Sequence, residues 1–377
     1  MRIAIFENIM TDGGNEIEFN RILVDELKNL GHEVFFYVPE NYIFPFDYKT
    51  PVKKIKGDSV SYKNSGGIKK IFASVKREIN RQRWYSQLYE LQNNFDALII
   101  PTATYRYLRA LSHNKLKKIS VPLIFVFHGI NPNEAPKFLS ESEKFLPNQN
   151  IKMAVINLAD DIFGKNLDNI YNILPPVFVA RDLKLEVADA PPEILTIGFF
   201  GQYRREKKIE NLLAAFKRGN YNRKVKLLVQ GATMHEEDAE EFERIIKPYE
   251  NLENISVIRG ALIGKDWQQA IINVDALLLP YSAPRFKYHW GGMLFTALGY
   301  EKPVVSSDDM NPEIFSRYKI GETFKSGNLE DLTAKLEYFI NNFDENFHVY
   351  KKNLREASEN FSPVNFGKRF EKIILKK

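Results

Sequence analysis

A cluster of cationic residues in the second half of the chain could bind phosphate. The cluster consists of Arg204, Arg205, Lys207 and Lys208. It follows the apolar run 195–200, which has the character of a buried strand, and it precedes an amphipathic helical pattern. Ligands of open α/β sheets bind outside the carboxyl ends of the strands. Lysine and arginine groups at such a place predict a diphosphate site. The alternative is an exposed, solvated basic turn.

A second segment of the same half carries two glycines at the start of an apolar helix. Gly291 and Gly292 precede the helical run 293–298, with Arg285 and Lys287 shortly before them. Free backbone amides at a helix start attract anions. The helix dipole contributes about 0.3 to 1 kcal/mol per charge at an exposed site, so the nearby cations must share the work. The alternative is a helix that begins with glycines for close packing.

Composition excludes several other classes of chemistry. The chain has 377 residues, no cysteine and a net charge of +5. Disulfides, cysteine-ligated zinc and thiol catalysis are therefore excluded, and the charge is too small for a dedicated nucleic-acid binder. We see no Asp-x-Asp pair of the kind that holds a divalent metal beneath a diphosphate, so we expect no metal and no other cofactor. Without a secretory signal or a long apolar run, a cytoplasmic protein is expected, either free or associated with the membrane face.

These sites require a framework of parallel strands. Short apolar runs alternate with amphipathic helical patterns throughout, which is typical of parallel α/β architecture. Expected strands are 2–6, 33–38, 97–101, 123–127 and 153–156 in a first series, and 195–200, 226–230, 255–258, 276–279 and 303–306 in a second. The Pro-containing stretch 180–192 separates them. We therefore predict domains at 1–185 and 193–359, with an amphipathic helix at 360–377 that packs back on the first domain.

The order of these motifs resembles that of retaining GT-B glycosyltransferases of glycosyltransferase family 4. The matching features are the glycine-lysine turn at 198–208, Gly231, 257–260, 279–281, the glycine helix start and 302–305, and, in the first half, the loop 12–16 and the helix end 27–34. The resemblance spans most of the chain. It implies two doubly wound Rossmann-like domains that face each other across a cleft. It also implies transfer of a sugar from a nucleotide-diphosphate donor, with retention, in cell-surface polysaccharide or glycoconjugate synthesis.

The resemblance also assigns roles to individual residues. Lys207 corresponds to the lysine that binds the donor diphosphate, and Gln202 stands where the family has an arginine, for which Arg204 or Arg205 could substitute. Two glutamates that usually contact the donor sugar and the ribose are replaced by Tyr288 and Thr296. Hydroxyls are weaker acceptors than carboxylates, so sugar and ribose recognition must differ.

Two histidines are relevant to the same chemistry. His128 ends a strand, just before Gly129, at a place where similar enzymes touch the transferred sugar, and with Lys207 it is our candidate catalytic residue. The alternative for His128 is a structural role. His289 could line the donor loop. The remaining expected donor-binding residues are Gly13, Gly14, Gly201, Gly231, Tyr281 and Met293.

On the acceptor side, the segment 68–91 combines an apolar helical face with many cations. Basic amphipathic helices bind anionic membranes, which would favour a lipid-linked glycan acceptor. The alternative is an ordinary helix with its apolar face turned to the sheet.

Other functions remain open at this stage. A sugar-nucleotide epimerase would use the same diphosphate site but needs acid-base carboxylates that the sequence does not mark. A non-catalytic GT-B-like protein that binds a nucleotide sugar or a partner is the rival from another class. A dinucleotide oxidoreductase is disfavoured, because no Gly-x-Gly-x-x-Gly follows the first strand.

Overall fold

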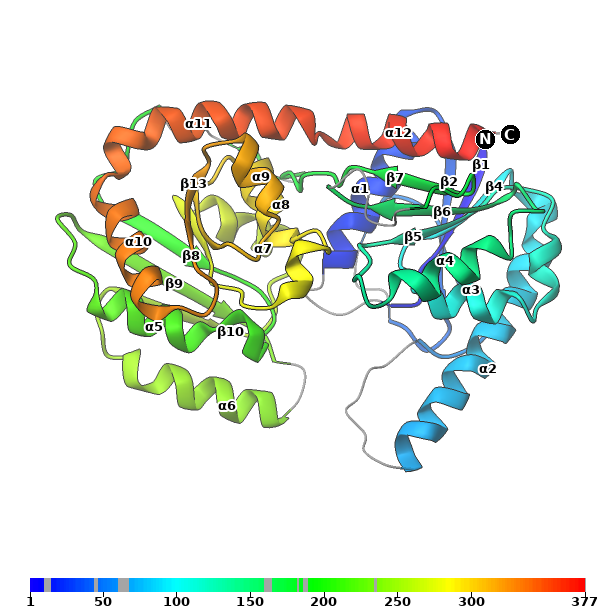
Figure 1. The fold of residues 1–377 in the computed structure, drawn as a ribbon, viewed down its shortest axis with the longest axis horizontal. Helices are drawn as coiled ribbons and strands as arrows, with labels where there is room; N and C mark the ends of the chain where they lie inside the picture. The colour runs from blue at the N-terminus through cyan, green and yellow to red at the C-terminus, as the bar shows by residue number, and fades with distance from the viewer. Residues whose placement is uncertain are drawn as a thin grey trace. The chain divides into compact units, whose positions relative to one another are not determined.

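The computed structural model of the chain describes residues 1–9, 15–43, 47–59, 68–158, 165–181, 183–185, 189–233 and 236–376. The chain forms two compact units (Figure 1). The first consists of Met1–Thr11, Glu16–Pro175 and Pro363–Lys377, and the second of Asp12–Asn15 and Pro176–Ser362.

The first unit is built on a seven-stranded parallel sheet in the order β3-β2-β1-β4-β5-β6-β7. Its strands are β1 (Arg2–Phe6), β2 (Glu33–Pro39), β3 (Val52–Ile55), β4 (Ala97–Ile100), β5 (Leu123–Phe127), β6 (Ile151–Ile156) and β7 (Ile170–Ile173). Its helices are α1 (Asn15–Asn29), α2 (Ile68–Leu91), α3 (Tyr105–Leu111), α4 (Ala135–Glu143) and α12 (Pro363–Leu375). The central strands β4, β5 and β6 are buried along their whole length and, apart from Lys152 of β6, apolar, because helices cover both faces of a parallel sheet.

The second unit has a six-stranded parallel sheet in the order β10-β9-β8-β11-β12-β13. Its strands are β8 (Leu195–Phe199), β9 (Val225–Gly231), β10 (Ile255–Arg259), β11 (Ala276–Leu279), β12 (Val304–Ser307) and β13 (Gly321–Phe324). Its helices are α5 (Ile209–Arg218), α6 (Glu236–Ile246), α7 (Gly264–Ile272), α8 (Gly292–Gly299), α9 (Pro312–Arg317), α10 (Leu329–Asn341) and α11 (Phe343–Asn360). The strand order reverses between β8 and β11, and such a switch point leaves a crevice at the carboxyl ends of the strands.

The last helix packs on the first unit, as the amphipathic spacing predicts. Phe366 of α12 lies edge-on to Phe19 of α1, with 5.6 Å between the ring centroids. A Cβ on Gly367 would come within 2.7 Å of the Glu26 side chain, so α12 approaches α1 too closely for a larger residue. Glu371 pairs with Nε2 of His32 at 2.9 Å, which gives His32 a structural role between the end of α1 and α12.

A buried lysine fixes the end of α12. Lys152 of β6 is 2% exposed, and its ammonium donates to the carbonyls of Ile373 at 2.7 Å, Ile374 at 3.4 Å and Lys376. The last carbonyls of a helix have no partner within the helix. The ammonium supplies that partner and also complements the negative end of the helix dipole.

Candidate active site

The switch point of the second unit brings together the two loops that follow β8 and β11. The backbone amide of Ser282, after β11, donates to the carbonyl of Glu206, after β8, at 2.7 Å. The side chains of Glu206 and Arg285 form an ion pair between the same loops. Gly201 opens the first loop with φ +124°, a conformation that side chains rarely adopt, and its amide donates to Gln230 at 2.8 Å. The cationic turn is therefore held at the carboxyl edge of the sheet.

Lys207 is the central cation of this edge. Its ammonium lies directly over Gly201, where an added Cβ would be 2.5 Å away, and it faces the rings of Tyr281 at 5.1 Å and Phe199 at 6.0 Å. Within the part of the chain that the structure describes, this ammonium makes no hydrogen bond or ion pair. Burial, reinforced by the charge of Arg204, lowers the pKa of Lys207 to about 7. A desolvated cation without an acceptor is suited to receive an anion.

The two arginines of the turn have different partners. Arg205 turns away to pair with Glu241 of α6 at 2.8 Å. Arg204 extends along the loop, 3.5 Å from the Gln202 side-chain oxygen and 3.9 Å from Glu206. Half of the Arg204 side chain is exposed, so it can reach a ligand beside Lys207. Of the two arginines expected to support Lys207, the geometry favours Arg204.

The start of α8 differs from its expected form. The amide of Gly291 does not face outward, because it donates to Oδ1 of Asn311 at 2.7 Å. A Cβ on Gly291 would lie 2.1 Å from Sδ of Met310, so this glycine allows close packing. Asn311 also donates to the carbonyls of Phe286 and His289, which fixes the loop between β11 and α8 to the segment after β12. The helix start at Gly292 and Met293 is buried.

Tyr281 forms the apolar floor of the site. It is 3% exposed, its ring lies 5.1 Å from that of Phe286, and burial raises the pKa of its hydroxyl. Among the described residues, that hydroxyl has no hydrogen-bond partner. A buried hydroxyl without a partner is costly, and a bound polar ligand would relieve that cost.

Comparisons with known proteins identify the family of the second unit and the fold of the chain. Residues 182–357, nearly the whole second unit, match the family described as Glycosyl transferases group 1. The second unit is a group 1 glycosyltransferase domain. No curated protein sequence matches the chain.

Solved glycosyltransferase structures share the fold of the whole chain. HepE from Anabaena, solved with UDP and glucose, has a TM-score of 0.68 at 12% identity, over 99% of this chain and 98% of HepE. A glycosyltransferase from Rickettsia africae has a TM-score of 0.68 at 16% identity, over 100% and 99% of the two chains. WaaG, a glycosyltransferase of lipopolysaccharide biosynthesis, has a TM-score of 0.60 at 13% identity over the full length of both. These structures confirm the expected GT-B fold, and the family match confirms the expected enzyme class, a glycosyltransferase.

The two positions without the family's glutamates have different surroundings in this glycosyltransferase. Thr296 is 1% exposed and donates its hydroxyl to the carbonyl of Gly292 at 2.9 Å, one turn earlier in α8. Tyr288 is partly exposed and follows the short turn at Pro284–Lys287. Because its proton is used inside the helix, Thr296 offers a ligand only acceptor capacity.

Other residues expected in the donor site are placed as follows. Gln202 is buried and forms an isolated bridge with Ala232, next to the end of β9. Gly231 ends β9, where a Cβ would lie 2.3 Å from the Phe242 ring, so a packing requirement accounts for this glycine. His289 is bonded through its backbone amide to the Arg285 carbonyl at 2.9 Å. Gly13 and Gly14 lie outside the described residues.

A polar network that the sequence did not mark borders the same edge. Ser326, after β13, donates to Asp309 at 2.6 Å and contacts Ser282 at 2.8 Å, and Lys287 lies 3.3 Å from Asp309. The detectable signal was Asp308-Asp309 directly after a buried strand. The network ties the loops after β11, β12 and β13 together. Among the described residues, no three of His, Asp and Glu lie together in a way that could hold a metal ion.

In the first unit, His128 follows β5 at the carboxyl edge of its sheet. Its Nε2 donates to the carbonyl of Pro101 at 2.8 Å, and its ring lies edge-on to Phe19 at 4.6 Å. This carbonyl follows β4, the neighbouring strand. The bond holds the ring at the sheet edge and assigns the Nε2 proton.

Glu7, at the end of β1, is the buried acid of the same edge. It accepts hydrogen bonds from the amides of Asn8 and Ile9 at 2.8 Å each, from Asn20 at 3.2 Å and from Thr102 at 2.6 Å. Burial nevertheless raises the pKa of Glu7 to about 7. Glu7 is not among the site residues predicted from the sequence, although a carboxylate that directly follows an apolar strand is a detectable signal.

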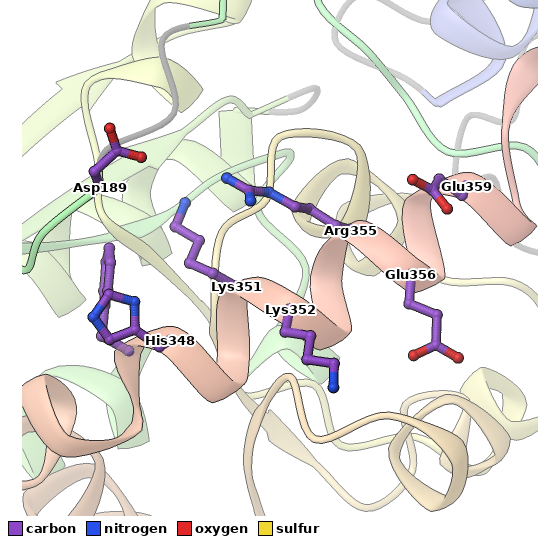
Figure 2. A pocket seen from close by; sticks show the side chains of 8 residues that line it. Asp189, His348, Lys351, Lys352, Arg355, Glu356 and Glu359 are labelled. Carbon is purple, nitrogen blue, oxygen red and sulfur yellow. The ribbon is translucent and has the colours of Figure 1, made fainter.

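A hollow of about 420 Å³ lies elsewhere in the second unit, along α11 (Figure 2). Lys351 and Arg355 reach from α11 toward the segment of Asp189, whereas Lys352 points the other way. Lys351 donates to the Glu301 carbonyl at 2.8 Å and Arg355 pairs with the Glu301 side chain at 3.1 Å. Glu301 precedes β12, so this hollow is at the amino edge of the sheet, away from the Lys207 site.

Proposed function

We propose that the chain transfers a sugar from a nucleotide-diphosphate donor to a hydroxyl acceptor on a glycan or a lipid-linked glycan, with retention of configuration. The observation that carries the proposal is the Lys207 ammonium, desolvated and without an acceptor at the switch point of a group 1 glycosyltransferase unit. A diphosphate at this place would supply the missing counter-charge.

The chemistry follows from the groups at this edge. The bond between the anomeric carbon and the diphosphate oxygen breaks, and the nucleoside diphosphate leaves with the electron pair. The acceptor oxygen bonds to the anomeric carbon as its proton passes to the departing diphosphate. Negative charge grows on the leaving oxygen, and Lys207 and Arg204 stabilise it. The ring of Tyr281 faces the Lys207 ammonium and shields the contact between this ammonium and the leaving oxygen from water, which strengthens their electrostatic attraction.

The solved relatives support the donor class and the pathway. The HepE structure contains UDP and glucose, and WaaG acts in lipopolysaccharide synthesis. By this analogy, we propose a uridine or guanosine diphosphate sugar as donor and a role in cell-surface polysaccharide or glycoconjugate synthesis. His128, held at the carboxyl edge of the first unit, is the proposed contact for the transferred sugar.

Thermal unfolding in the presence of nucleotide sugars tests the donor site. A ligand at 100 times its Kd stabilises by roughly 2.7 kcal/mol. We expect the shift to vanish in Lys207→Ala and to persist in Arg205→Ala, a matched control from the same turn whose guanidinium is bound to Glu241. An undiminished shift in Lys207→Ala would remove Lys207 from the site.

A second function is favoured by one observation, the buried and internally bonded Thr296 at the place of a family glutamate. A protein that binds nucleotide sugars without turning them over could lose this carboxylate at no cost. Release of nucleoside diphosphate, measured with a panel of donors and glycan acceptors, separates the two. Donor binding without any release favours the non-catalytic protein.

A further inference from the structure

An apolar stripe of α2 faces away from the core of its unit. Phe72, Val75 and Ile79 are 70%, 52% and 53% exposed. Their spacing of three and four residues places them on one face of the helix. The alternative in which the apolar face turns to the sheet therefore fails for the first half of α2.

The second half of the same helix is an ordinary core helix. Trp84 and Tyr85 are fully buried and Leu88 is 1% exposed. At 100° per residue, these three side chains project roughly opposite to the exposed stripe. In Figure 1 the first half of α2 extends beyond the rest of its unit. The stripe is thus a surface feature, and the core does not need it.

Exposed cations, Lys76 and Arg83, lie beside the stripe. The helix contains six lysines and arginines against two glutamates. Lys76, one turn after Phe72, is 70% exposed and pairs with Asp58 at 2.7 Å, and Arg83, one turn after Ile79, is exposed. Among the described residues, no helix is long and apolar enough to cross a bilayer. A face with apolar residues between cations matches the surface of an anionic bilayer.

A fourth exposed apolar side chain lies in a loop that polar contacts connect to α2. Ile43, 86% exposed, lies in the loop after β2. Asn41 of that loop accepts a hydrogen bond from the Ser59 amide at 2.8 Å, next to Asp58, the partner of Lys76. These contacts hold the loop beside the first half of α2.

We propose that Phe72, Val75 and Ile79, with Lys76 and Arg83, form a docking face for anionic phospholipid bilayers. The helix follows β3, so its first half lies at the carboxyl edge of the sheet, the edge that carries Glu7 and His128. In open parallel sheets the ligand lies at that edge. Docking would therefore bring the acceptor side of the unit to the membrane surface, where a lipid-linked glycan is presented. This last step rests on the proposed glycosyltransferase function, whereas the docking itself does not.

The experiment measures co-sedimentation of the full chain with vesicles of phosphatidylglycerol mixed with phosphatidylcholine, and with vesicles of phosphatidylcholine alone. We expect binding to the anionic vesicles, weakened by salt. Replacing the three apolar residues together by serine should weaken binding roughly tenfold or more. Lys76→Gln and Arg83→Gln should each weaken it about fivefold.

Val364→Ser is the matched control, because Val364 lies on α12 of the same unit, is 50% exposed and is outside the stripe. All substituted side chains are exposed, so circular dichroism should show unchanged folding. The proposal would be overturned if the triple variant bound anionic vesicles as tightly as the wild type does. It would also be overturned if the wild type bound neutral vesicles as tightly as anionic ones. Loss of a concentration-dependent dimer in the triple variant would also overturn it, because the face would then bind a second copy. The nucleotide-sugar thermal shift should persist in every variant, so failure of docking and failure of the donor site are distinguishable.

Discussion

Replacing Lys207 by methionine should make the protein more stable. The ammonium is desolvated beside Gly201 and Tyr281, and no hydrogen bond or ion pair in the described structure compensates it. Methionine has a similar length and fills the same space against the Tyr281 ring without a charge. Groups arranged for ligand binding commonly reduce stability in this way.

The size of the gain follows from the pKa of Lys207. Burial lowers this pKa from 10.5 to about 7, so the unfolded chain binds the proton up to a higher pH than the folded chain. The cost to folding is therefore complete below pH 7 and shrinks as the pH rises toward 10.5. At 1.36 kcal/mol per pKa unit the ceiling is about 5 kcal/mol. Because the side chain is still partly exposed, solvent screening leads us to expect about 1 to 2 kcal/mol, or roughly 3 to 6 °C in Tm.

Thermal unfolding at pH 6 and pH 9 measures the effect, and Lys152→Met is the matched control. Burial also lowers the pKa of Lys152, but its ammonium donates to the carbonyls that end α12. Its loss should therefore lower the free energy of unfolding, by about 1 to 3 kcal/mol. The reasoning is refuted if Lys207→Met lowers Tm as Lys152→Met does, or if its gain is as large at pH 9 as at pH 6.

Three further outcomes follow from the same structure. Binding of a nucleoside diphosphate at pH 8 should take up a proton in the wild type and none in Lys207→Met, because the pKa of Lys207 is about 7 before the anion binds. Calorimetry in buffers of different ionisation enthalpy measures this proton uptake. Identical uptake in both proteins contradicts the prediction. Glu7→Gln should stabilise the protein more at pH 8 than at pH 5, by up to about 3 kcal/mol in the free energy of unfolding, which thermal unfolding at the two pH values measures. Burial raises the pKa of Glu7 from 4.5 to about 7, so the folded wild type loses stability as this carboxyl ionises. A stabilisation that is independent of pH argues against this reasoning. Gly299→Ala should destabilise the protein by about 1 to 3 kcal/mol, because the added Cβ would lie 1.9 Å from the Phe178 carbonyl oxygen. An unchanged Tm would show that the backbone at Phe178 moves to make room for the methyl group.

The central strands were predictable from the sequence, and three of the four edge strands were not. The ten expected strands correspond to ten of the observed strands, whereas β3, β7 and β13 were missed. The central strands are apolar because both their faces are covered. By contrast, β3 has the sequence Val-Lys-Lys-Ile with three exposed residues, and β13 starts with a glycine at φ +154° whose place is fixed by the Val304 backbone. Tertiary pairing determines such strands, and local composition does not.

The candidate site shows the same division. The spacing of a buried strand, a glycine and a lysine was sufficient to place Lys207 at the carboxyl edge. The partners of the neighbouring charges come from remote positions, such as Glu241 for Arg205, 36 residues away, and Glu206 for Arg285, 79 residues away. No local pattern indicated that the Gly291 amide would be bound by Asn311. Long-range pairing therefore decided which of the expected donor-binding groups remain available.

The lysines whose pKa is lowered by burial show why Lys207 differs from the rest. In the described structure there are four, and three of them donate to backbone carbonyls: Lys152 to the end of α12, Lys302 to Ile272 at 2.9 Å, and Lys351 to Glu301 at 2.8 Å. Those three ammonium groups are desolvated but satisfied, as structural lysines must be. Lys207 is desolvated without an acceptor, and it lies at the carboxyl edge where the strand order reverses. A structural role would have supplied an acceptor from the chain, so the partner of Lys207 is expected to be an anionic ligand.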